Sequence, residues 1–243
     1  MPTIAEQLYK AGRLEEAIEA LNQELRKNPT DRHQRTFLFE LLCFTGQFDR
    51  AEKQLELVIE GDQKRQMGAL LYKAAIAGER TRLELFEKGL AEDGAGATTA
   101  NGSSGPMVAG TWNGKPFSSI EDADPRIGPR LEVLAGGNYV WIPVHHVNSV
   151  TMEAPKRLRD LLWIPAVIRT ARGFKGADLG EVLLPVLSPF SFKHADPDVR
   201  LGRKTVYQDE GGLEVPYGQK MMLVDNEEVP LLELRSLEIQ QAE

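Results

Sequence analysis

The chain has 243 residues, 42% hydrophobic and 27% charged, with a single cysteine. This composition is typical of a soluble globular protein and excludes disordered, collagen-like and disulfide-stapled chains. The net charge of −7 argues against a nucleic-acid partner, because proteins that bind nucleic acid usually carry a basic face. Cys43 cannot form an internal disulfide, which suits a reducing compartment. With no signal-peptide pattern and no apolar run of about 20 residues, we expect a cytoplasmic protein without a membrane partner.

Residues 1–91 have the composition and periodicity of α-helices. A shift of 34 residues, the period of tetratricopeptide repeats, aligns residues of the same type. The matched pairs are Ile4 and Leu38, Leu8 and Leu42, Gly12 and Gly46, Leu14 and Phe48, Ala17 and Ala51, Leu21 and Leu55, and Leu25 and Ile59. Glycine between two helices allows the left-handed conformation that ends the first one. We therefore predict tetratricopeptide-like hairpins, with an ordinary helical bundle as the alternative.

A third, degenerate hairpin is predicted over residues 66–76 and 80–90, broken at Gly78. Stacked hairpins form a concave surface that binds extended or helical peptides. If the first helix of each pair faces inward, the residues on the partner-binding side are Tyr9, Lys10, Thr36, Glu40, Cys43 and Phe44. The alternative for Cys43 and Phe44 is a place in the hydrophobic core.

The second half of the chain has the pattern of strands and turns. Residues 92–106, which include DGAGATTANGSSG, are predicted to be a flexible linker or a long exposed loop. Residues 107–243 are predicted to form a β-rich domain, either a small bent sheet or an open barrel with a short helix, which makes the chain α+β. The predicted strands are residues 139–144, 147–152, 163–170, 181–187, 221–224 and 231–239.

Two further features of this β-rich domain can be interpreted from the sequence. Residues 122–134 read as a helix with an acidic N-terminal cap that ends at Gly136 and Gly137. Trp141 and Trp163 are each predicted to anchor the core, because tryptophan buries a large area. The alternative is that one of the two tryptophans lies on a partner-binding face.

Residue patterns typical of catalysis or metal binding are weak. His145 and His146 are neighbours on what reads as an extended segment, so their side chains are expected to point to opposite faces. His194 precedes Asp196 and Asp198 in a segment typical of a solvated turn rather than a zinc site. No nucleophile motif or phosphate-binding loop occurs. We predict no catalytic residues, no metal and no cofactor, with a metal-dependent enzyme that uses these histidines as the minor alternative.

The sequence resembles the ImpE (SciE, TagJ) family of accessory proteins of bacterial type VI secretion systems. The segments that carry this likeness are residues 37–51 (FLFELLCFTGQFDRA), 122–132, 138–144, 158–166, 201–205 (LGRKT), 218–222 (GQKMM) and 230–235 (PLLELR). The C-terminal segments occur as an ordered set, which is more specific than a helical hairpin alone. The linker departs from the family in being a plain stretch of small residues.

This resemblance implies a cytoplasmic, non-enzymatic accessory protein associated with the contractile sheath. The partner it implies is the small sheath subunit TssB, contacted through a helical segment near the N-terminus of TssB. The implied role links sheath material to the ClpV ATPase, which recycles contracted sheath. A generic repeat scaffold for an unrelated partner is the alternative, and the matched segments do not fix which residues contact the partner.

Overall fold

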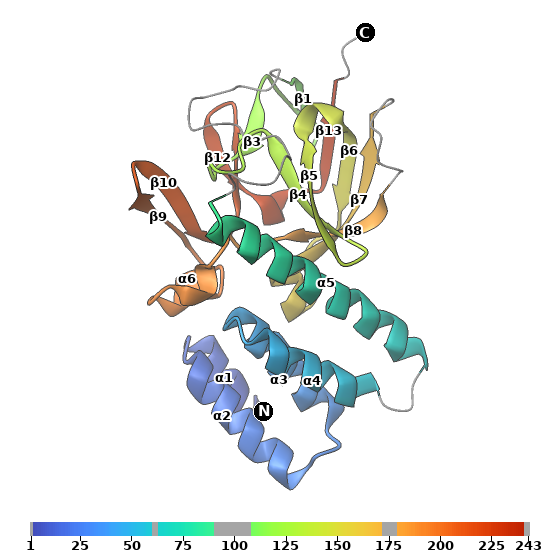
Figure 1. The fold of residues 1–243 in the computed structure, drawn as a ribbon, viewed down its shortest axis with the longest axis vertical. Coiled ribbons are helices and arrows are strands. Elements are labelled where there is room, and N and C mark those ends of the chain that lie inside the picture. The colour runs from blue at the N-terminus through green and yellow to red at the C-terminus, as the bar shows by residue number, and fades with distance from the viewer. Residues whose placement is uncertain (1, 60–62, 90–107, 172–178, 241–243) are drawn as a thin grey trace.

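Helices occupy the N-terminal part of the chain and strands the C-terminal part, as Figure 1 shows. The computed structural model describes residues 2–59, 63–89, 108–171 and 179–240. The predicted linker, residues 92–106, lies outside these ranges. Over the described ranges, no helix combines the length and the apolar character that a membrane span requires.

Two helical hairpins follow each other at the N-terminus. The first consists of α1 (Ile4–Lys10) and α2 (Leu14–Lys27), and the second of α3 (Arg32–Phe44) and α4 (Phe48–Ile59). Each hairpin turns at a glycine with a left-handed backbone: φ is +75° at Gly12 and +68° at Gly46. The two predicted hairpins and their turns are confirmed.

The predicted third hairpin is wrong, because α5 (Gln63–Glu87) is one continuous helix. Gly78 lies inside it and does not interrupt it. A Cβ atom at Gly78 would come within 2.8 Å of the Leu134 side chain. The glycine therefore permits close packing of the helix against the sheet rather than a turn. In Figure 1 this helix runs diagonally between the smaller helices and the strands.

An open sheet of eight antiparallel strands forms most of the C-terminal part. In spatial order the strands are β2 (Lys115–Phe117), β1 (Gly110–Trp112), β13 (Ser236–Ile239), β6 (Val147–Met152), β7 (Trp163–Thr170), β8 (Gly180–Pro185), β4 (Arg130–Ala135) and β5 (Asn138–Pro143). A smaller sheet has the order β12 (Glu227–Pro230), β11 (Met221–Val224) and β3 (Ile120–Asp122), and β9 (Thr205–Glu210) pairs with β10 (Leu213–Gly218). The predicted α+β class is confirmed, with open sheets rather than a closed barrel.

The helix predicted over residues 122–134 is wrong, because this segment is the end of β3, a tight turn and most of β4. The acidic side chains cap the turn and not a helix. The backbone N–H of Asp124 donates to Asp122 Oδ1 at 2.9 Å, and that of Arg126 donates to Asp124 Oδ1 at 3.0 Å. Gly128, with φ of +60°, then reverses the chain into β4. Similarly, residues 231–239 begin with a 3-10 turn, Leu231–Glu233, before β13.

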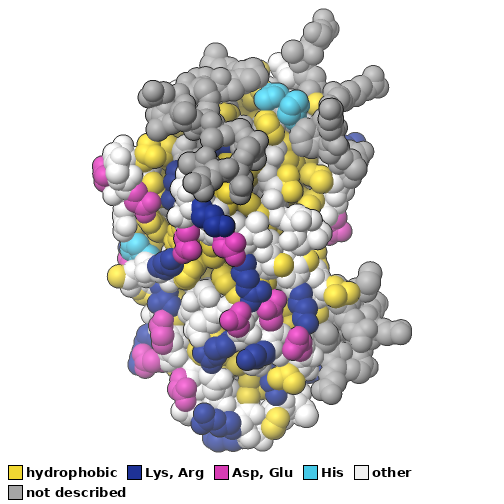
Figure 2. Space-filling view, in the orientation of Figure 1, with side chains coloured by type: hydrophobic (Ala, Val, Ile, Leu, Met, Phe, Trp, Pro, Cys, Tyr) yellow, Lys and Arg dark blue, Asp and Glu magenta, His cyan; other side chains and the backbone are white. Residues whose placement is uncertain are grey.

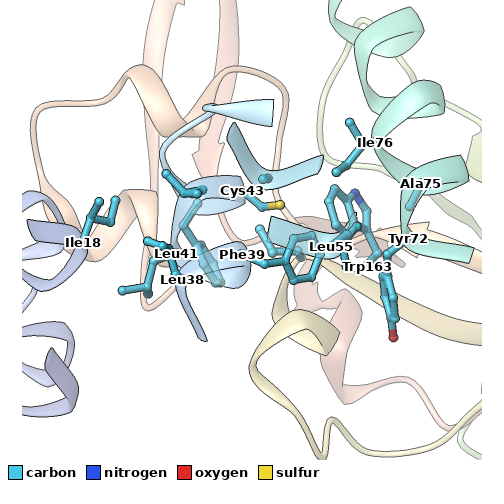
Figure 3. Close-up of a cluster of buried hydrophobic side chains, with 14 of the residues drawn as sticks. Ile18, Leu38, Phe39, Leu41, Cys43, Leu55, Tyr72, Ala75, Ile76 and Trp163 are labelled. Carbon is cyan, nitrogen blue, oxygen red and sulfur yellow. The ribbon is translucent and has the colours of Figure 1, made fainter. Parts of the chain in front are cut away.

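A hydrophobic core is shared between the helices and the sheet. Trp163 at the start of β7 is 2% exposed and belongs to the same buried cluster as Tyr72 and Ile76 of α5 and Cys43 of α3. Figure 3 shows Trp163 beside Tyr72, below Ile76. A second cluster lies entirely within the β-rich part. The two parts are therefore joined by buried apolar side chains.

The segment between β8 and β9 lies against the turns of both hairpins. It contains a 3-10 turn, Ser191–Lys193, and α6 (Pro197–Arg200). A Cβ atom at Gly12 would lie 3.2 Å from Pro197, and one at Gly46 would clash with the ring of Phe192. The guanidinium of Arg203 also donates to the main-chain oxygens of Tyr9 and Lys10. The C-terminal half thus covers the turn end of each hairpin.

Candidate partner-binding site

A groove of about 430 Å³ opens between the helices and the short turn that precedes β7. We call it the α3–α5 groove. Its lining residues are Arg32, His33, Thr36 and Phe39 of α3, Leu55 and Val58 of α4, Gly68, Ala69 and Tyr72 of α5, and Arg157 and Arg159 at the turn. Its volume lies within the range of about 300–1,000 Å³ that is usual for ligand pockets.

The floor of the α3–α5 groove is apolar and aromatic. Phe39, Leu55 and Tyr72 are all buried. The rings of Phe39 and Tyr72 pack with their centroids 6.1 Å apart. These residues come from three consecutive helices of the repeat stack, so the stacking itself forms the floor.

The rim of the groove is positively charged. Among the residues whose side chains the structure describes, its lining includes three arginines and one histidine and no carboxylate. Arg159 is held in place, since its Nη1 donates to Glu40 Oε1 at 2.9 Å and its guanidinium lies 5.0 Å from the centre of the Tyr72 ring. Burial raises the pKa of Glu40, and Arg159 partly offsets this effect. The turn is fixed by Asp160, whose carboxylate accepts the backbone N–H of Arg157 at 2.8 Å.

The sequence-predicted residues of the helical half lie in different environments. Thr36 lines the groove, and Glu40 lies behind it as the partner of Arg159. Tyr9 is edge-on to Phe37, with its ring 5.8 Å away, and packs under Arg203 near Lys10. These contacts place the α1 residues by the C-terminal half and not in the groove.

Cys43 and Phe44 are 3% and 0% exposed and belong to the shared core. Burial raises the pKa of the Cys43 thiol well above its usual value. Both side chains therefore lie in the hydrophobic core, which was the alternative to a partner-binding position.

The two tryptophans also differ. Trp163 is buried in the shared core, and its indole N–H donates to Glu79 at 3.4 Å. Trp141 is half-buried on β5, with the guanidinium of Arg130 lying 3.9 Å from its ring centre and Phe86 of α5 packed edge-on against it. Neither tryptophan lines the α3–α5 groove.

A buried ionic cluster joins α5 to the sheets, and the sequence analysis missed it. Arg82 is 1% exposed; its Nε donates to Glu132 Oε1 at 2.7 Å and its Nη1 to Glu79 at 2.9 Å. Lys220 contacts Asp122 at 2.5 Å and also pairs with Glu132. The partners are far apart in sequence, so no local motif marks them. This cluster fixes the position of the helix on the sheet.

Electrostatics within this cluster push two carboxyl pKa values apart. Burial would raise the pKa of Glu132, but the charges of Arg82 and Lys220 hold it well below its usual range. At Asp122 burial dominates over the attraction of Lys220 and raises the pKa to about 6. Such shifts accompany structural ion networks as well as active sites. The cluster is enclosed, which favours a structural role.

His145 and His146 are placed differently from the sequence-based prediction, whereas His194 lies in a turn as predicted. His145 and His146 lie in a 3-10 turn, Val144–His146, with ring centroids 4.2 Å apart, so the prediction of opposite faces is wrong. His194 Nδ1 accepts the backbone N–H of Asp196 at 3.0 Å, and Asp196 in turn caps α6. Within the described residues, no group of three or more His, Cys, Asp and Glu side chains could hold a metal ion.

Comparisons with known proteins cover nearly the whole chain. The ImpE protein family matches residues 114–238, and a tetratricopeptide repeat family matches residues 8–75. The type VI secretion system accessory component TagJ of Pseudomonas aeruginosa is 36% identical over 263 aligned positions, covering 98% of this chain and 91% of TagJ.

A solved structure has the same fold. The crystal structure of protein VPA1032 from Vibrio parahaemolyticus matches with a TM-score of 0.82 and 21% identity, covering 99% of this chain and 98% of that one. The repeat match agrees with the hairpins of α1 to α4, and the other family match spans most of the sheet. This chain belongs to the ImpE protein family.

Proposed function

We propose that this protein is a non-enzymatic accessory protein of a type VI secretion system that works by binding another protein. The observation that carries the proposal is the 36% identity, over 98% of the chain, to a relative named as a type VI secretion accessory component. The repeat hairpins support a binding role, because tetratricopeptide-like stacks present surfaces for peptides and helices. Its place of action would be the cytoplasm.

The partner we propose is the small sheath subunit TssB, bound through a helical segment near the N-terminus of TssB. The α3–α5 groove suits such a segment, because its floor offers apolar contacts to one face of a helix. By holding sheath material, the protein would assist the recycling of contracted sheath by the ClpV ATPase. A scaffold for a different partner would use the same surface and is the alternative.

A binding measurement tests the proposal. The full chain and the TssB protein of the same organism would be purified separately and mixed in a titration calorimeter. We expect a dissociation constant below about 100 µM, which corresponds to a binding free energy of about −5.5 kcal/mol. TssB lacking its N-terminal helical segment is the matched control and is expected not to bind. Equal binding by both forms, or by neither, would contradict the proposed contact.

A further inference from the structure

The α3–α5 groove combines an apolar floor with a positive rim in a protein whose net charge is −7. Its arginines come from two distant parts of the chain, α3 and the turn before β7, and converge on one opening. A concentration of one sign of charge around an apolar floor attracts and orients a partner of the opposite sign. The expected partner therefore carries carboxylates beside apolar side chains.

Arg159 is suited to recognise such a carboxylate. Its contacts with Glu40 and Tyr72 hold the guanidinium in a fixed orientation at the groove. Its Nε–H is buried and has no hydrogen-bond partner among the described residues. That atom is enclosed by the protein, so a partner would meet the remaining guanidinium edge, and a guanidinium is well suited to bind carboxylates. The part of the guanidinium that is exposed to the groove, since the Arg159 side chain is 18% exposed, is where an incoming Asp or Glu side chain would bind.

Further apolar side chains are exposed on two of the helices that line the groove. Leu57, Leu70 and Leu71 are 45%, 60% and 41% exposed and lie on α4 and α5, close in sequence to the lining residues. Figure 2 shows hydrophobic side chains exposed among mixed acidic and basic ones on one face of the helical part. The last helices of a repeat array usually have a polar outer face, so exposed leucines here favour a contact surface.

From these observations we propose that the α3–α5 groove binds an acidic amphipathic helix. Its apolar face would lie over Phe39 and Tyr72, with carboxylates directed to Arg157 and Arg159. The groove volume accommodates several side chains from one helical face and not a whole helix. This inference rests on the proposed function in taking the partner to be a helical segment of another protein, and it adds the site and the charge of that segment.

Gly68 provides a test that separates binding from folding. It lines the groove, and a Cβ atom placed there would meet no atom of the described residues within 4 Å. Gly68→Trp would thus fill the groove without a backbone clash, and Gly68→Ala is the matched control. Arg157→Glu tests the charge of the rim, and Arg169→Glu, at an exposed position of β7, is its control. Circular dichroism would establish that each variant is folded.

Two probes would be titrated by fluorescence anisotropy against the full chain. One is labelled TssB; the other is a synthetic helical peptide with Leu on one face and Glu on the opposite face, with a Lys-for-Glu peptide as its control. We expect Gly68→Trp to weaken binding of the Glu peptide about tenfold or more. Arg157→Glu should weaken it about three- to tenfold and reduce its salt dependence. Gly68→Ala and Arg169→Glu should bind within about twofold of the parent chain.

The outcomes separate the two proposals. If the Glu peptide responds to the groove variants but TssB does not bind, the groove inference stands and the proposed partner fails. If TssB binds and neither probe responds to the variants, the groove inference is overturned and the proposed partner stands. Equal affinity for the Glu and Lys peptides would also overturn it. Loss of both probes in Gly68→Trp supports both proposals.

Discussion

Replacing Arg82 should lower the stability of the fold, because this residue makes the central ion pairs of the buried cluster between α5 and the sheets. It makes four hydrogen bonds, two to Glu132, one to Glu79 and one to the main-chain oxygen of Leu187, while only 1% exposed. Replacing it with methionine would keep much of the apolar contact and the helix propensity. It would also leave two buried carboxylates short of their main counter-charge.

Breaking a buried ion pair by removing one partner typically costs about 3–5 kcal/mol. Lys220 still contacts Glu132, so part of the charge remains balanced. Among the described residues, Glu79 retains the long contact with the Trp163 indole. We therefore expect Arg82→Met to lower the free energy of unfolding by about 3–4 kcal/mol, out of a total of about 5–15 kcal/mol for a typical protein.

The assay is urea unfolding followed by far-UV circular dichroism and by tryptophan fluorescence. Arg80→Met is the matched control: it lies on the same helix, but its partners Asp49 and Glu52 are at the surface and its side chain is 35% exposed. Its loss should cost at most about 1 kcal/mol. If both variants lost the same small amount of stability, the buried cluster would not hold α5 on the sheet, and the reasoning would be refuted.

Three other predictions concern single side chains. The pKa of Asp122 is raised in the fold from 3.8 to about 6, so its contribution to stability is greatest at low pH and is lost as pH rises through about 6. The free energy of unfolding, measured from pH 4 to 7, should therefore fall less with rising pH in Asp122→Asn than in the parent chain, and an equal fall in both would contradict the raised pKa. The Cys43 thiol should react with a disulfide reagent only after unfolding, and rapid reaction of the native protein would contradict its burial. Gly46→Ala should lower the unfolding free energy by about 1–3 kcal/mol, because φ is +68° and the new Cβ would meet Phe192, and a melting temperature unchanged from the parent would count against this packing.

The sequence predicts most of the helices, strands and turns that depend on residues close together in the chain. The 34-residue repeat identifies the hairpins because Gly12 and Gly46 are required at turns with positive φ. The strands over residues 147–152 and 163–170 are confirmed with the same bounds, because β-branched and aromatic residues mark them. Local pattern also misled at Gly78, where the reason for a glycine is a contact with Leu134 far along the chain.

The candidate site is only partly visible in the sequence. Thr36 was predicted from the repeat register and does line the groove, because its position depends on the helical period alone. Arg157 and Arg159 were not predicted, because more than 100 residues separate them from α3 and only the fold brings them together. The cluster of Arg82, Glu132 and Lys220 is hidden for the same reason.

The helical repeats do not form the candidate site alone. The turn that carries Arg157 and Arg159 leads directly into β7, and Trp163 at the start of that strand is packed against α5. Arg159 also bonds to Glu40 of α3, so a shift of the sheet relative to the helices would displace the rim of the groove. The buried cluster around Arg82 opposes such a shift. The β-rich part therefore has a specific role: it supplies two of the three arginines at the rim of a groove whose floor belongs to the helices, and it holds them at a fixed distance from that floor.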